Sequence, residues 1–231
     1  MGNLNWKNIM TSKQRLTVNL FLKRGVDVAI ASIALVCLSP CLAIIAIAIF
    51  LSDFKSPIYA GERVGRMGRR FRMLKFRSMQ VGSDKNGPSS TSVDDFRITR
   101  VGRLIRRTKL DELPQLWNVL IGEMSIVGPR PQVSWAVDLY SLEELKLISV
   151  RPGLTDFASL IFRDEGEILA GSSDPDGDYL RLIAPGKNLL GLHYVETLNI
   201  VTDFRIMVAT FCAVLGFDPL PLLPRSIRDV F

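Results

Sequence analysis

Two adjacent carboxylates, Asp111 and Glu112, are the clearest candidates for chemistry in this chain. They lie in the segment Thr-Lys-Leu-Asp-Glu-Leu-Pro-Gln, which runs from residue 108 to 115. Thr108 is a capping residue type, and Pro114 is tolerated only in the first turn of a helix, so we expect the pair at a helix N-terminus. The helix dipole there favours an ionised carboxylate, which predicts a lowered pKa for Asp111. Such a carboxylate can attack phosphorus when cations reduce the repulsion between two anions, although acids in a first turn are commonly only capping charges.

The cations that this chemistry needs are concentrated in residues 55–107, which hold 14 Lys and Arg against four acids. A magnesium ion or the arginines nearest the carboxylates would reduce the repulsion. These arginines are Arg100, Arg103, Arg106 and Arg107. A basic segment of this kind attracts anionic lipid headgroups, nucleic acid or a phosphorylated substrate, and part of it can be only a solvated face on a membrane. Its few scattered aromatic residues do not make a base-stacking platform, so nucleic acid is the weaker alternative.

Composition removes several classes of function. The chain has 231 residues, is 48% hydrophobic and carries a net charge of +6, which fits one substantial core and excludes intrinsic disorder. Three cysteines do not build a disulfide scaffold and indicate a reduced, cytoplasm-facing protein. One histidine and the lack of a Cys-x-x-Cys pair exclude imidazole-rich metal sites and zinc modules. The common glycine-rich nucleotide-binding motifs do not occur either.

Residues 26–51 form an apolar run that is long enough to cross a bilayer as a helix. Basic residues flank the run on both sides, with Lys23 and Arg24 before it and Lys55 and Arg63 among those after it, which favours two cytoplasmic ends. Ser39-Pro40 lies in the middle, where proline removes a backbone donor and kinks a helix. We therefore expect a re-entrant membrane helix of the helix-break-helix type, with the Ser39 hydroxyl bound to a carbonyl that the proline frees. A spanning helix with a mild kink remains the alternative.

Periodicity predicts the remaining elements in outline. Residues 69–79 alternate like a strand, 82–95 resemble a loop, and 98–107 and 113–120 have helical spacing, with Gly122 ending the second helix. We expect an amphipathic helix over 138–148, an irregular insertion over 163–185 and mostly helix over 188–217. The apolar part of that last stretch is too short to span a membrane, and is expected to pack or to lie at the interface.

The long motif that begins at Asp111 resembles the signature of the bacterial sugar transferases known as monotopic phosphoglycosyl transferases. It reads Asp-Glu-Leu-Pro-Gln-Leu-Trp-Asn-Val-Leu-x-Gly-Glu-Met-Ser-Ile-Val-Gly-Pro-Arg-Pro and ends at Pro131. Other matches occur in the family's order over nearly the whole chain. They are Lys-Arg-x-x-Asp from Lys23, Ser39-Pro40, Lys-Phe-Arg-Ser-Met from Lys75 and Arg-Pro-Gly-Leu-Thr from Arg151.

The resemblance implies transfer of a sugar phosphate from a UDP-sugar to undecaprenyl phosphate, with release of UMP and a requirement for Mg²⁺. It implies a ping-pong mechanism in which Asp111 is the nucleophile and contacts Mg²⁺, while Glu112 assists by positioning or proton transfer. Lys75 and Arg130 would bind the diphosphate, with Arg151 as a further candidate. Asp203 would pair with Lys23 or Arg24. This reaction is the first membrane step of glycoconjugate synthesis at the cytoplasmic face of the bacterial inner membrane, and it feeds downstream glycosyltransferases.

The expected fold is α+β and mostly helical. A re-entrant membrane helix and interfacial amphipathic helices would surround a small cytosolic catalytic core. The expected divisions are an N-terminal segment 1–20, the membrane hairpin 21–52, the catalytic domain 53–217 and a C-terminal tail 218–231, which makes this a small, catalytic-domain-only form. The family often has Gly-Trp-Ala-Gln where this chain has Asp-Phe-Ala-Ser from Asp156, and the insertion 163–185 also differs. The donor sugar, the pathway and a homodimer stay open. The alternative function is a non-enzymatic, membrane-anchored basic protein that binds anionic lipid or nucleic acid.

Overall fold

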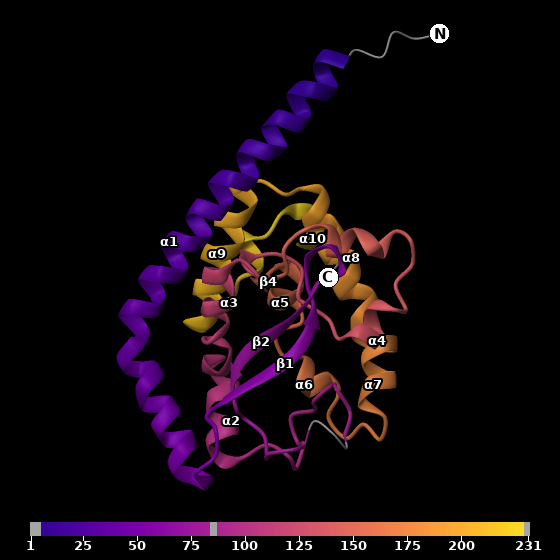
Figure 1. The fold of residues 1–231 in the computed structure, drawn as a ribbon. Helices are drawn as coiled ribbons and strands as arrows, with labels where there is room; N and C mark the ends of the chain where they lie inside the picture. The colour runs from indigo at the N-terminus through magenta and orange to yellow at the C-terminus, as the bar shows by residue number, and fades with distance from the viewer. Residues whose placement is uncertain (1–5, 84–86, 229–231) are drawn as a thin grey trace.

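The protein is a mostly helical α+β domain with one long N-terminal helix (Figure 1). This computed structural model describes residues 6–83 and 87–228, with side chains from residue 20 onward. The helices are α1 (Trp6–Asp53), α2 (Arg100–Arg107), α3 (Gln115–Ile121), α4 (Ser134–Val137), α5 (Phe157–Ile161), α6 (Glu165–Ile168), α7 (Pro175–Asp178), α8 (Ala184–Glu196), α9 (Ile200–Val214) and α10 (Arg225–Arg228). The strands are β1 (Ile58–Val64), β2 (Arg70–Phe76), β3 (Ser125–Val127) and β4 (Gly153–Thr155). The shorter turns are η1 (Arg66–Gly68), η2 (Leu110–Glu112), η3 (Glu144–Ser149), η4 (Tyr179–Ile183) and η5 (Leu220–Leu222).

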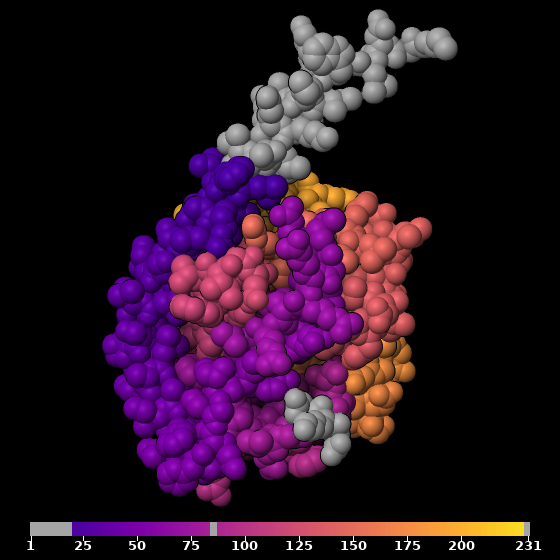
Figure 2. Space-filling view, viewed as in Figure 1, coloured from indigo at the N-terminus to yellow at the C-terminus, as the bar shows by residue number. Residues whose placement is uncertain are grey.

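Helix α1 lies along one side of the domain (Figures 1 and 2). Its candidate membrane span is Leu20–Asp53, with a mean hydropathy of 2.8 and only 11% of the most apolar window buried. A core helix of this composition would be mostly buried. The helix therefore fits an apolar environment outside the domain.

The helix does not break at Ser39-Pro40, because α1 continues through Pro40 to Asp53. The expected helix-break-helix is wrong in this respect, and α1 instead curves around the domain (Figure 1). Pro40 has no N–H for the carbonyl of Val36, and the Ser39 hydroxyl donates to that same oxygen at 2.8 Å. The expected hydroxyl-to-carbonyl bond is thus present, and it satisfies a group that would otherwise favour an interruption.

Polar residues near the start of the apolar run attach α1 to the domain. Lys23 Nζ donates to Asp203 at 2.7 Å and to the carbonyl of Val127 at 2.9 Å, which is one of the two pairs expected for Asp203. Asp27 is 3% exposed and accepts from the hydroxyl of Ser125 and the N–H of Ile126. These contacts explain why an apolar run contains a buried carboxylate: it pairs with β3 rather than facing lipid.

Two small sheets and a shared core complete the domain. Strands β1 and β2 form an antiparallel hairpin, and β3 pairs in parallel with β4. The main core joins side chains from α1, β2, α3, β3, α5, α8 and α9, and a second cluster packs Ile45 and Ile49 of α1 against Phe76 and Ile105. Helix α1 is therefore part of the fold at two places along its length.

Most of the expected elements are present, and some segments differ from the expectation. The strand at 69–79, the loop at 82–95 in its described part and the helices near 98–107, 113–120 and 188–217 are confirmed. No long helix covers 138–148, where the chain forms turns and η3, so that expectation is wrong. The insertion 163–185 holds two short helices and η4. Leu223 and Ile227 of the segment expected to be a tail are buried in the core, and residues 1–5 and 229–231 lie outside the described residues.

Candidate active site

The carboxylate pair lies in a turn between two helices. Asp111 and Glu112 belong to η2, which Lys109 starts with a left-handed backbone (φ 56°). Thr108 ends α2, and its hydroxyl donates to the carbonyl of Leu104 at 2.9 Å. The expectation that Thr108 caps the helix that carries the pair is therefore wrong. The pair precedes α3 and does not form its first turn.

Glu112 is held by two cations from separate elements. Lys75 Nζ, from β2, donates to Glu112 Oε1 at 3.0 Å. Arg130 Nη1 donates to Oε2 at 3.0 Å, and Arg130 Nη2 donates to Oε1. Burial opposes the negative charge of Glu112, but the charges and hydrogen bonds of Arg130 and Lys75 outweigh it and hold its pKa below the usual range. Glu112 is thus a fixed anion that orients two cations.

Asp111 is the free member of the pair. It is 5% exposed, and among the described residues its carboxylate has no recorded hydrogen bond or ion pair. Burial, helped by the neighbouring charge of Glu112, raises the pKa of Asp111, opposite to the expected direction, because together they outweigh the charges of Lys75, Arg106 and Arg130. The charges of those three cations nevertheless act favourably on the Asp111 carboxylate. Asp111 can therefore meet an incoming anion where the repulsion is reduced.

Local geometry explains how Arg130 reaches Glu112. Arg130 follows β3 in the turn Gly-Pro-Arg-Pro, and β3 approaches β4 closely at Gly128 and Gly153. A Cβ on Gly153 would lie 2.1 Å from the backbone nitrogen of Gly128, and one on Gly128 would lie 2.5 Å from the carbonyl oxygen of Arg151. Only glycine fits at both positions. The two glycines therefore set where the turn leaves the sheet and carries Arg130 to the pair.

Arg151 is not brought to the pair. Its Nε donates to the carbonyl of Gly122 at 3.1 Å, just after α3. Arg24 binds the same end of α3, with donations to the carbonyls of Val119 and Leu120 at 2.6 and 2.9 Å. Two arginines thus bind the last carbonyls of α3, where helix ends favour cations. This placement gives Arg151 a structural contact away from Glu112.

Asn118 is a positioning residue that our sequence reasoning missed. Its Oδ1 accepts from the N–H of Leu74 at 2.9 Å, and its Nδ2 donates to the carbonyl of Arg72 at 2.8 Å and to Glu123 at 2.7 Å. The side chain thereby fixes α3, which follows the pair, against β2, which carries Lys75. The available signal is an asparagine between the apolar residues of a predicted helix, a residue type that is normally placed at caps and turns.

The donor set fits a magnesium ion only when a substrate supplies further oxygens. Among the described residues, no group of three or more His, Cys, Asp or Glu could hold a metal. Asp111 offers a carboxylate without a partner, whereas both oxygens of Glu112 bind cations. Mg²⁺ commonly uses one or two carboxylates together with phosphate oxygens and water. Asp111 therefore fits as the protein ligand of an ion shared with a diphosphate.

A mostly apolar cavity with a few charged side chains in its walls adjoins the pair through Arg130. Its walls include Arg130, Asp156 and Lys187, and Lys187 pairs with Glu165 from the insertion 163–185 and lies 5.5 Å from the centre of the Tyr179 ring. Asp156 caps α5 by accepting from the N–H of Ser159 at 2.7 Å. Asp156, where the chain departs from the family pattern, and the insertion 163–185 thus both lie beside Arg130, one of the two cations that bind Glu112.

Residues 18–217 match a family model described as bacterial sugar transferase. The chain is 35% identical over 207 residues to an exopolysaccharide production protein of Sinorhizobium fredii, and the match covers 83% of this chain and 84% of that protein. It is 40% identical over 150 residues to a UDP-glucose:undecaprenyl-phosphate glucose-1-phosphate transferase of Escherichia coli, covering 62% of this chain and 32% of that protein.

A third relative is a UDP-N-acetylgalactosamine-undecaprenyl-phosphate N-acetylgalactosaminephosphotransferase of Aeromonas hydrophila. It is 40% identical over 144 residues, which cover 61% of this chain and 34% of the relative. The chain therefore spans about a third of the length of two of these relatives and most of the length of the other.

Proposed function

This chain belongs to the bacterial sugar transferase family, and we propose that it transfers a sugar 1-phosphate from a UDP-sugar to undecaprenyl phosphate. The products are UMP and undecaprenyl-diphosphate-sugar, which begins the membrane stage of a bacterial polysaccharide or other glycoconjugate. The relatives named for this transfer support the substrates. The observation that carries the proposal is the division within the pair: Lys75 and Arg130 hold Glu112, and Asp111 beside it has no partner among the described residues.

The first step uses Asp111 as the nucleophile. A carboxylate oxygen attacks the sugar-bearing phosphorus of the donor, and the bond from that phosphorus to the oxygen of the UMP phosphate breaks. UMP leaves with the electron pair, and the phosphosugar remains on Asp111 as an acyl phosphate ester. Lys75, Arg106 and Arg130 reduce the repulsion between the carboxylate and the diphosphate.

The second step regenerates the carboxylate. A phosphate oxygen of undecaprenyl phosphate attacks the same phosphorus, and the bond from Asp111 to phosphorus breaks. Neither step moves a proton, because both nucleophiles and both leaving groups are oxyanions. This is consistent with Glu112 as a positioning anion that holds Lys75 and Arg130, and it favours positioning over proton transfer.

Magnesium would add positive charge where the two anions meet. Bound by Asp111 and by phosphate oxygens of the donor, Mg²⁺ would neutralise charge on the diphosphate and on the departing UMP phosphate. The protein's own part is to keep Asp111 free of other partners. Lys75 and Arg130 remain on Glu112, so a metal ion and the cations do not compete for one carboxylate.

A re-entrant placement of α1 in the inner membrane, with both ends on the cytoplasmic side, is part of the proposal. A straight helix from Lys23 to Asp53 would be roughly 45 Å long. In the fold, Lys23 binds Asp203 near one end, and Asp53 binds Arg77 at the other. Both ends therefore contact the same domain, which supports two ends on one side of the membrane better than a spanning helix.

Apolar residues of α1 and α9 support membrane contact. These exposed side chains recur at helical spacing along the outer surface of each helix. On α1 they include Ile33, Val36, Ile44, Ile47 and Leu51, and on α9 they include Val201, Phe204, Phe211 and Val214. The pattern on α9 fits an amphipathic helix that lies at the interface, because its other side packs in the core.

Release of UMP tests the proposal. The protein in nanodiscs is mixed with a panel of UDP-sugars, with and without undecaprenyl phosphate. We expect continuous UMP release from at least one donor when lipid is present, and about one UMP per protein when it is absent. Asp111→Asn should abolish both, whereas the exposed control Asp138→Asn should retain them.

Two results would remove the proposal. One is a lack of UMP release from every donor, which would favour the non-enzymatic membrane-anchored protein. The other is a normal rate in Asp111→Asn, which would exclude Asp111 as the nucleophile. UMP release that requires lipid even for a single turnover would instead replace the ping-pong mechanism with direct transfer.

A further inference from the structure

The Arg77 side chain binds both the end of α1 and the loop that connects α1 to β1. Its Nη1 and Nη2 each donate to one carboxylate oxygen of Asp53 at 2.6 Å, and its Nε donates to the carbonyl of Ser56 at 2.7 Å. The backbone N–H of Arg77 also donates to the carbonyl of Pro57 at 2.8 Å. The Arg77 side chain is only 8% exposed. One guanidinium therefore fixes the last residue of α1 and the loop that follows it.

Residues next to Arg77 in the chain connect it to Asp111 and Glu112. Arg77 follows β2 two residues after Lys75, the cation that binds Glu112. Next to it, the carbonyl of Ser78 accepts from the N–H of Thr99 at the start of α2 at 3.0 Å. A Cβ on Gly102 of α2 would lie 1.9 Å from that carbonyl oxygen, so the helix backbone packs against it without a gap. Helix α2 then runs to the turn that carries the pair.

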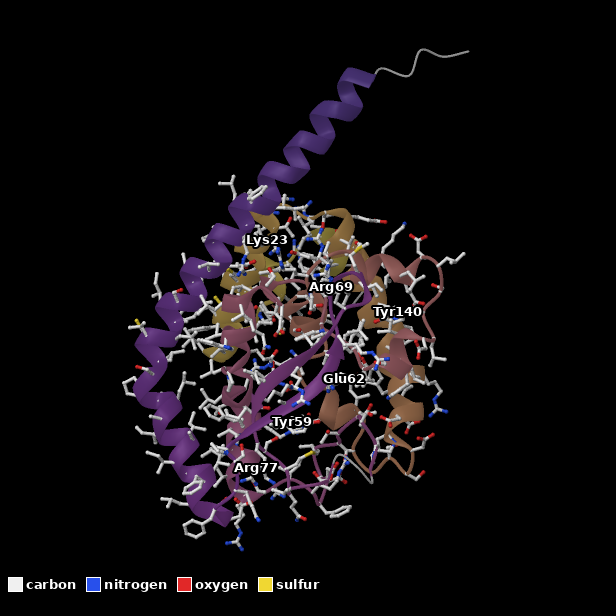
Figure 3. All side chains as sticks on the ribbon, viewed as in Figure 1. Lys23, Tyr59, Glu62, Arg69, Arg77 and Tyr140 are labelled. Atoms are coloured by element: carbon white, nitrogen blue, oxygen red, sulfur yellow. The ribbon has the colours of Figure 1, made fainter. Side chains whose placement is uncertain are left out.

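The attachment at Arg77 lies at the opposite end of α1 from the attachment at Lys23. Figure 3 labels Lys23 and Arg77 near the two ends of the part of α1 that lies along the domain. Lys23 binds Asp203 and the carbonyl of Val127, which fixes the first end. The Asp53–Arg77 pair holds the second end just after the strand that carries Lys75, beside the apolar cluster that contains Ile49 of α1. Because both ends of this part of α1 are held, the fold sets the distance of Asp111 and Glu112 from the exposed apolar side of α1.

We propose that Asp53 and Arg77 are positioning residues that set the depth of Asp111 relative to the membrane, and that they serve the lipid half of the reaction. This inference rests on the function proposed above. The donor is soluble and can reach the site at any distance from the membrane surface, whereas the phosphate of the lipid acceptor stays at that surface. A change in the depth of the site therefore slows the second step and leaves the first step unchanged.

A matched pair of variants separates this role from a general loss of an ion pair. Asp53→Asn removes the carboxylate that binds Arg77, the residue that directly follows β2. Glu62→Gln makes the same chemical change in an ion pair of the β1–β2 hairpin. In that pair Arg70 Nη1 lies 3.0 Å from Glu62 Oε1, and the two side chains are 66% and 58% exposed. Figure 3 labels Glu62 on the hairpin, between the two attachments.

Each half of the reaction is measured alone. Labelling of the protein by a UDP-sugar without lipid reports the first step, and loss of the label after undecaprenyl phosphate is added reports the second. In nanodiscs we expect Asp53→Asn to keep the labelling rate within twofold of wild type and to lose at least tenfold in transfer. A short-chain, water-soluble polyprenyl phosphate in detergent should restore transfer to within about twofold of wild type. Glu62→Gln should match wild type in every assay.

Arg77→Lys keeps the charge but loses the two-pronged contact, and should show the same selective loss of transfer. The inference is wrong if Asp53→Asn transfers in nanodiscs as fast as Glu62→Gln. It is also wrong if labelling falls by the same factor as transfer, because the variant would then disturb the pair itself. An unlabelled wild-type protein would instead contradict the proposed function.

Discussion

Removal of the charge on Asp203 should weaken the attachment of α1 measurably. Lys23 Nζ lies 2.7 Å from Asp203 Oδ2, the two side chains are 11% and 5% exposed, and the Tyr194 hydroxyl donates to Asp203 Oδ1 at 2.8 Å. The pair is therefore nearly dry, so Asp203→Asn leaves a buried ammonium without its counter-ion. Loss of one partner of a buried pair typically costs about 3–5 kcal/mol, and we expect the lower end because Asn still accepts from Tyr194.

A cost of about 3 kcal/mol corresponds to a fall of roughly 6–12 °C in the melting temperature of a chain of this size. The assay is a double-mutant cycle of Lys23→Met and Asp203→Asn, followed by circular dichroism during thermal unfolding in detergent at one scan rate. We expect a coupling free energy of about 2–3 kcal/mol, because the double variant removes both buried charges. The exposed Arg70–Glu62 pair is the control, with an expected coupling below about 1 kcal/mol. Equal coupling free energies in the two cycles would refute the claim that a buried ion pair between Lys23 and Asp203 holds α1 on the domain.

Three other outcomes follow from the same structure. Gly102→Ala should destabilise the protein by about 1–3 kcal/mol, since its Cβ would lie 1.9 Å from the carbonyl of Ser78, whereas Gly25→Ala in open space on α1 should stabilise it by about 0.5–1 kcal/mol; equal melting temperatures would contradict this contrast. Excess EDTA should stop UMP release, and added Mg²⁺ should restore it, because Asp111 offers a metal one carboxylate beside the diphosphate; full activity in EDTA would exclude the ion. Replacement of both Ser39 and Pro40 by leucine should straighten α1 and expose a cysteine at position 5 to periplasmic labelling in a Cys-free background; continued protection would count against the re-entrant placement.

The sequence motifs predicted a set of site residues but not how their side chains interact. Lys75, Glu112 and Arg130 lie in three separate parts of the chain, so their spacing gives no sign that both cations bind the same carboxylate. The direction of the Asp111 pKa shift depends on burial, which the first-turn argument did not include. Arg151 matches the family pattern equally well, yet it binds the end of α3.

Local chemistry was predictable where it depends on neighbours in the chain. Pro40 frees the carbonyl of Val36, and Ser39 is the nearest hydroxyl, so that hydrogen bond follows from the sequence alone. Whether the helix then bends or breaks depends on what holds its ends. The contacts of Lys23 and Asp53 with residues 180 and 24 positions away decide that, and no local pattern encodes them.

Mass spectrometry of the protein after incubation with a UDP-sugar alone tests the central claim most directly, because a covalent intermediate can form only if the free carboxylate attacks the donor. Proteolysis should give the peptide that contains Asp111 with the mass of one added phosphosugar, and undecaprenyl phosphate should remove the label. Asp111→Asn should stay unlabelled, and Glu112→Gln should label far more slowly. A label on another residue, or a peptide that stays unmodified while UMP is released, would contradict the account.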